Sequence, residues 1–210
     1  MKYLNFSKKE ITQLQKLNTP SKVQDFLDTI AINFEADGID TLKSPLAVFR
    51  TKNAHCIEGA ILAAYIFSIQ GKPALLMNLK SNKKDFDHTV ALFKENGYFG
   101  AISKSNHYSL RYREPVYKNI RELALSYFHE YFTDDGEKTL RKYSVPLNLN
   151  IFEDDWPTAE ENLWGIGEEL QEIKYYDIAP KSILKNLRKA DKIEIEVGKI
   201  TEYKKKQSLK

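Results

Sequence analysis

The feature that most constrains the fold is one apolar segment, CIEGAILAAYIFSIQ, which covers residues 56–70. Its length and apolar character predict a buried helix. Gly71 and Pro73 follow the segment, and these two residue types commonly stand just beyond the end of a helix. A chain of 210 residues is long enough to build one well-buried core around such a helix.

The residues after this helix predict a small antiparallel sheet. Residues 74–79, 88–93 and 99–102 have the composition of strands. Asn96 and Gly97 separate the last two, and Asn-Gly is a strong signal for a tight hairpin. One buried helix beside such strands predicts an α+β fold.

The rest of the chain predicts further helices on both sides of this core. Ser7 and Glu10 form a capping-box pattern for a helix to about residue 17, and Thr19 and Pro20 have the pattern of a second helix start. That second helix continues at helical spacing to Phe34, and residues 39–53 read as a connector. The other expected elements are helices at about 117–131, 158–173 and 180–190, and a strand or hairpin at 192–203.

Composition excludes several classes of protein. With 42% hydrophobic and 29% charged residues, the chain has the composition of a globular protein. A net charge of +3 is too small to indicate nucleic-acid binding. The single cysteine excludes an internal disulfide. No segment resembles a signal peptide or a membrane span, so we expect a cytoplasmic protein. We also expect one domain over residues 1–203 and a basic tail at 204–210.

Cys56 lies in the first turn of the predicted buried helix, with Thr51 or Asn53 as the expected N-cap. A helix N-terminus carries partial positive charge and free N–H groups, which favour the thiolate and can hold an oxyanion. Small residues follow at helical spacing: Gly59, Ala60 and Ala63. This stripe predicts that another backbone approaches the helix closely beside the sulfur.

His88 begins the strand that forms the predicted hairpin. If Asn96 and Gly97 are the turn, Glu95 pairs with Tyr98, and counting back places His88 opposite Ser105. A polar group at about 103–106 is then positioned to fix the tautomer of the imidazole. His55 adjoins the cysteine, but neighbours in a helix point about 100° apart, so we expect it to be a poor partner.

The order of these elements resembles the core of the transglutaminase-like cysteine protease superfamily. The likeness covers about residues 45–110 and is carried by NAHCIEGA, DHTVALF and GYFGAIS. The resemblance implies that Cys56 is a nucleophile and His88 its base. It also places Ser103 where the family has an aspartate that orients the histidine. Asn106, Asp87 and Asp85 are alternatives for that role.

Two functions follow from these features. The first is a thiol-dependent enzyme for acyl transfer or amide hydrolysis, with a peptide, protein or small amide as substrate and no cofactor or metal. Its site includes Cys56, His88, Ser103 and Asn106. The second is a catalytically quiet module of the same fold that binds a protein or peptide.

The candidates for substrate binding are three residues that precede the cysteine in the sequence. Arg50 and Lys52 are suited to an acidic or carboxylate-bearing substrate, and Asn53 is a candidate neighbour of the oxyanion. Water or an amine can resolve the same acyl-enzyme, so these residues are compatible with hydrolysis and with transfer.

Overall fold

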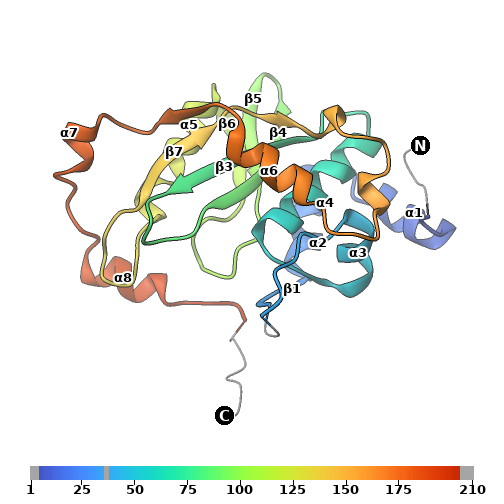
Figure 1. The fold of residues 1–210 in the computed structure, drawn as a ribbon, viewed down its shortest axis with the longest axis horizontal. Helices are drawn as coiled ribbons and strands as arrows, with labels where there is room; N and C mark the ends of the chain where they lie inside the picture. The colour runs from blue at the N-terminus through green and yellow to red at the C-terminus, as the bar shows by residue number, and fades with distance from the viewer. Residues whose placement is uncertain (1–4, 36–37, 204–210) are drawn as a thin grey trace, which may run out of the picture.

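The computed structural model describes residues 5–35 and 38–203, and shows a mixed α and β fold with a mostly antiparallel sheet (Figure 1). The expected basic tail at 204–210 lies outside the described residues. The helices are α1 (Lys8–Lys16), α2 (Pro20–Asp28), α3 (Pro45–Thr51), α4 (Cys56–Ile69), α5 (Ile120–Ser126), α6 (Trp164–Glu172), α7 (Lys181–Leu184) and α8 (Lys192–Gly198). None of the helices in the described ranges is long and apolar enough to cross a membrane.

The main sheet has the strand order β6-β5-β4-β3-β7-β9, with β8 also paired to β3, and all its pairs are antiparallel. It is larger than the sequence predicts. Its strands are β3 (Leu75–Ser81), β4 (His88–Glu95), β5 (Tyr98–Ile102), β6 (Arg113–Tyr117), β7 (Leu140–Ser144), β8 (Leu147–Asn148) and β9 (Tyr175–Asp177). A separate parallel pair joins β1 (Ala31–Ile32) to β2 (Asn53–Ala54).

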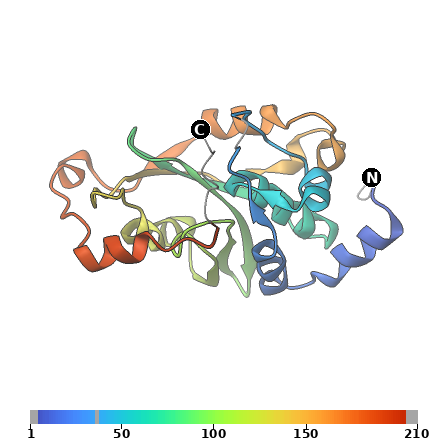
Figure 2. The ribbon, with the colours of Figure 1, turned by 90° about the horizontal axis from the view of Figure 1, so that it is seen from below.

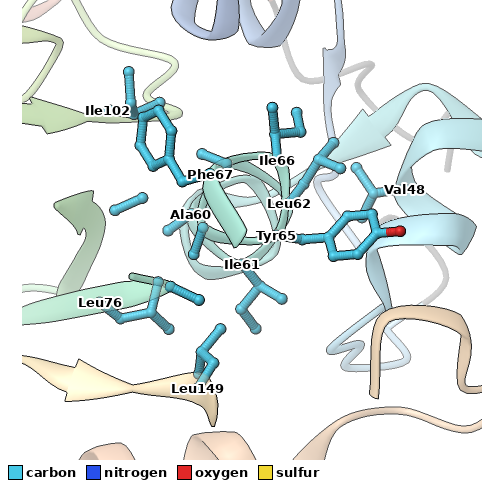
Figure 3. Close-up of a cluster of buried hydrophobic side chains, with 14 of the residues drawn as sticks. Val48, Ala60, Ile61, Leu62, Tyr65, Ile66, Phe67, Leu76, Ile102 and Leu149 are labelled. Atoms are coloured by element: carbon cyan, nitrogen blue, oxygen red, sulfur yellow. The ribbon is translucent and has the colours of Figure 1, made fainter. Parts of the chain in front are cut away.

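The expected buried helix is α4, and side chains surround it on all sides (Figure 3). It packs on one face of the sheet, where Leu76, Ala91 and Ile102 enter the same core, while α2 and α3 cover its outer side. Alternate strand residues such as Met77 point to the opposite face, which α5 covers. Figure 2 shows the helices α1 to α4 gathered at one end of the sheet and α8 at the other.

Several predicted features are confirmed. Ser7 caps α1 through a capping box with Glu10, and Thr19 caps α2 with Pro20 at the first helical position. The hairpin has the predicted register, because Glu95 pairs with Tyr98 and the two turn residues have positive φ, as a tight hairpin turn requires.

Two predictions in the N-terminal part are wrong. The second helix ends at Asp28, because Ala31 and Ile32 pair with Asn53 and Ala54 as strands instead of continuing the helix. The expected connector at 39–53 contains α3, whose N-cap Ser44 and first residue Pro45 repeat the signal that Thr19 and Pro20 give for α2.

The predictions for the second half are less accurate. Residues 192–203 alternate like a strand, but Asp191 and Glu194 form a capping box that begins α8. The expected helix at 117–131 shortens to α5 and a 3-10 turn, because Tyr117 pairs with Phe99 as a strand. Thr158 caps no long helix: α6 begins only at Trp164, and α7 covers four residues of the expected 180–190.

Candidate active site

Cys56 is the first residue of α4, as the sequence predicts, but its N-cap is His55 rather than Thr51 or Asn53. The first hydrogen bond of the helix runs from the N–H of Gly59 to the carbonyl of His55 at 3.0 Å. The N–H groups of Cys56 and Ile57 therefore precede the helical ladder, at the end of α4 where the helix dipole is positive. This position favours negative charge on the sulfur.

The small-residue stripe has the predicted effect at Gly59. A Cβ atom built on this glycine would lie 2.6 Å from the Cβ of Lys104, far inside normal van der Waals contact. The base of the Lys104 side chain, just after β5, thus packs against Gly59 where a larger residue in α4 would collide with it. This approach brings residues 103–105 beside the start of the helix.

Ser103 fixes the orientation of His88. The Ser103 hydroxyl donates to the carbonyl of Leu110, so its one proton is used there. It must then accept the bond from Nε2–H of His88, which lies at 2.7 Å. Nδ1 is the remaining nitrogen of that imidazole and is the one left for the thiol. Serine thus occupies the place that the resemblance gives to aspartate, and it sets the tautomer without a charge.

His55 lies beside the sulfur, so its expected exclusion as a partner is wrong. The reason is that His55 has extended backbone geometry as the N-cap and is not part of the helix. Its Nε2 lies 2.7 Å from the carbonyl of Thr41, which only an N–H can satisfy. Cys56 is hydrogen-bonded by both His55 and His88.

These contacts determine the charge of the thiol. Burial alone would raise the pKa of Cys56, but the hydrogen bonds with His55 and His88 outweigh burial and lower it to about 5. Burial likewise opposes protonation of His55, yet the bond to Cys56 and the charge of Glu58 raise its pKa to about 9. Both shifts favour a thiolate and an imidazolium over a neutral thiol and a neutral imidazole.

The sulfur opens onto a cavity of about 800 Å³. The cavity lies between the start of α4, the loop before β4, the segment after β5 and the chain around Tyr131. Of the residues that the sequence singles out, the cavity is lined by His55, Cys56, Asp85, Asp87, His88, Ser105 and Asn106. The hydroxyl of Tyr131, another lining residue, donates to the carbonyl of Phe86.

The alternative partners for His88 have other contacts. Asn106 forms a pair of hydrogen bonds with the backbone of Tyr203, at 2.9 and 2.8 Å. Asp87 accepts from the N–H of Ser81 at 2.9 Å, and Asp85 accepts from the hydroxyl of Thr139 at 2.6 Å. Ser103 is the residue that contacts the far nitrogen of His88.

The three candidates for substrate binding are not among the residues that line the cavity. Arg50 donates to Glu10 at 2.8 Å and so ties α3 to α1. The ammonium of Lys52 lies over the rings of Phe26 and Phe49, 4.6 and 3.9 Å from their centres. The side-chain oxygen of Asn53 accepts from Lys43 at 2.5 Å.

Two contributors to the site are not found by sequence reasoning. Glu58 is fully buried and accepts from the N–H of His55 at 3.1 Å, as the capping-box residue three positions after the N-cap. Glu35 lies 3.6 Å from His55 and has no local signal, because only the β1–β2 pairing brings it near.

The described residues hold no group of three or more His, Cys, Asp or Glu side chains placed to bind a metal ion. Comparison of the sequence with protein-family models and with curated proteins finds no match.

Proposed function

We propose that this chain is a thiol-dependent acyl-transfer enzyme, an amide or peptide hydrolase or a transferase of the transglutaminase-like kind. The observation that carries the proposal is a thiol at a helix N-terminus that is hydrogen-bonded by two imidazoles and opens onto a cavity. A buried cysteine that only filled space would need none of these three features.

The chemistry follows from the positions of the groups. The Cys56 thiolate attacks the carbonyl carbon of the substrate, and the N–H groups at the start of α4 face the oxyanion that forms. Expulsion of the amine leaves a thioester on the sulfur. His88, held by Ser103 with Nδ1 free, is placed to take a proton from the water or amine that resolves the thioester.

The charges around the cavity favour a neutral or cationic substrate. This replaces the acidic substrate that Arg50 and Lys52 suggest, since neither of them lines the cavity. Five carboxylates and two lysines line it: Asp85, Asp87, Glu130, Asp134, Asp135, Lys84 and Lys104. Lys84 is paired with Glu137 at 2.5 Å, and the ammonium of Lys104 is buried, so neither presents a free cation to a substrate. Glu130 and Asp135 are paired as well, with Arg113 at 2.5 Å and Lys189 at 3.0 Å, so the excess of negative charge comes from Asp85, Asp87 and Asp134.

The test is to trap the acyl-enzyme. The protein is mixed with an activated ester such as p-nitrophenyl acetate, and intact mass spectrometry follows the covalent adduct. We expect one acetyl group on the wild type, none on Cys56→Ala, and a rapid release of nitrophenol that matches the adduct. Added primary amine then distinguishes transfer from hydrolysis through the product. A wild-type protein that acquires no adduct would contradict the enzyme proposal and favour the catalytically quiet binding module.

A further inference from the structure

The thiol of Cys56 has two imidazole neighbours but only one proton to give. The Nε2–H of His55 is used by the carbonyl of Thr41, and the Nε2–H of His88 is used by the hydroxyl of Ser103. Each ring therefore has Nδ1 left for the sulfur. Both rings are competent to accept the thiol proton, and their surroundings decide which of them holds it.

The surroundings of the two rings differ in charge. The Nε2 atom of His55 lies 3.6 Å from a carboxylate oxygen of Glu35 and 3.6 Å from one of Glu58. Lys43 is the nearby cation, and its ammonium lies 3.7 Å from Glu58, so two carboxylates face one lysine. The far nitrogen of His88 contacts the neutral hydroxyl of Ser103. Carboxylates close to an imidazolium stabilise it, and a hydroxyl does so much less.

We propose that His55, rather than His88, holds the thiol proton in the resting site, and that this leaves His88 free as the base for the second half of the reaction. Ser103 contacts His88 where the resemblance expects an aspartate, whereas carboxylates of Glu35 and Glu58 lie close to His55. This inference rests on the proposed function for its mechanistic part, although the position of the proton is a separate property of the resting protein.

Each proton that is transferred during the cycle is accounted for, and the last step restores the resting site. At rest the proton has left the sulfur for Nδ1 of His55, so the thiolate and imidazolium charges cancel. When the thiolate forms its bond to the carbonyl carbon, His55 gives that proton to the departing amine as the C–N bond breaks. Water then gives a proton to His88 as its oxygen attacks the thioester. The C–S bond breaks, and the proton returns from His88 by way of the sulfur to His55.

The first experiment follows the ultraviolet absorbance of the thiolate against pH, and Cys56 is the single cysteine in the sequence. We expect His55→Gln, which keeps a donor for Thr41, to move the midpoint from about pH 5 towards the ~8.5 of an ordinary thiol. His88→Gln, which keeps a donor for Ser103, should move it less. An equal or larger effect of His88→Gln would overturn the assignment of the proton.

Glu35→Gln is the second variant, since its side chain is 28% exposed and the amide oxygen can still accept the hydrogen bond from the N–H of Thr41. It should also raise the midpoint, by less than His55→Gln does, while circular dichroism shows the fold unchanged. A midpoint equal to that of the wild type would count against the inference, because a merely structural contact of Glu35 gives that result.

The second experiment separates the two halves of the reaction with p-nitrophenyl acetate. His88→Gln should acquire the acetyl group at neutral pH and then retain it, so that the release of nitrophenol stops after one equivalent. His55→Gln should show little adduct at neutral pH and regain it in alkali. Continued turnover by His88→Gln would overturn the role given to that residue. Failure of the wild type to acquire acetate would overturn the proposed function, whereas the titration alone decides where the proton resides.

Discussion

Substitution of Gly59 by alanine tests whether the close approach of α4 and the strand segment builds the site. The added Cβ would lie 2.6 Å from the Cβ of Lys104, and carbon atoms in contact need about 3.5 Å or more. The helix and the segment must therefore separate by about 1 Å in a packed interior. Such overpacking costs about 1–3 kcal/mol, and the better helix propensity of alanine returns about 1 kcal/mol. We expect a net loss of up to about 2 kcal/mol in the free energy of unfolding, and a clear deficit against a helical glycine whose substitution gains the propensity term alone.

The assay is urea denaturation followed by circular dichroism, with Gly165→Ala as the matched control. Gly165 also lies in a helix, α6, but a Cβ there meets no atom within 4 Å. The control should leave the protein as stable as the wild type or slightly more stable. A Gly59→Ala variant that is as stable as the control would refute the reasoning, because the contact would then be no constraint.

Three further predictions follow from the same contacts. Ser103→Ala should lower turnover of the activated ester while the fold persists, because His88 loses its orienting hydrogen bond. Ser103→Asp should not restore turnover, because a carboxylate would face the carbonyl of Leu110. The ester assay measures both variants, and recovered turnover in Ser103→Asp would contradict the role given to the hydroxyl. Lys104→Met should leave the free energy of unfolding unchanged or raise it by up to about 2 kcal/mol, since among residues 5–35 and 38–203 the buried ammonium finds no hydrogen-bond partner. A loss above about 1 kcal/mol in urea denaturation would argue otherwise. Arg50→Ala should leave the alkylation rate of Cys56 unchanged, because its partner is Glu10 and not the cavity; a clear fall in that rate would show otherwise.

Local signals predict the centre of this molecule well. The apolar segment beginning at Cys56 and the Asn96-Gly97 turn each specify one structure through their own residues, so α4 and the β4–β5 register follow from the sequence. The capping residues Ser7 and Thr19 act in the same way. At these four places the local signal and the structure agree.

The remaining differences arise where two local signals compete or where a distant segment decides. The alternating residues after Lys192 favour a strand, but the capping box at Asp191 begins a helix. His55 is excluded only under the assumption that it is helical, and its N-cap geometry removes that assumption. Glu35 reaches the site through β-pairing between segments about twenty residues apart, which no local pattern records.

The most direct test of the central claim is the rate at which iodoacetamide alkylates the wild-type Cys56 across the pH range. The contacts with His55 and His88 lower the pKa of the thiol to about 5, so the thiolate should already be formed at pH 6. We expect the rate to rise with a midpoint near pH 5 and to stay level through neutral pH. A rate that rises only around pH ~8.5, as for a free thiol, would show that no imidazole activates this cysteine.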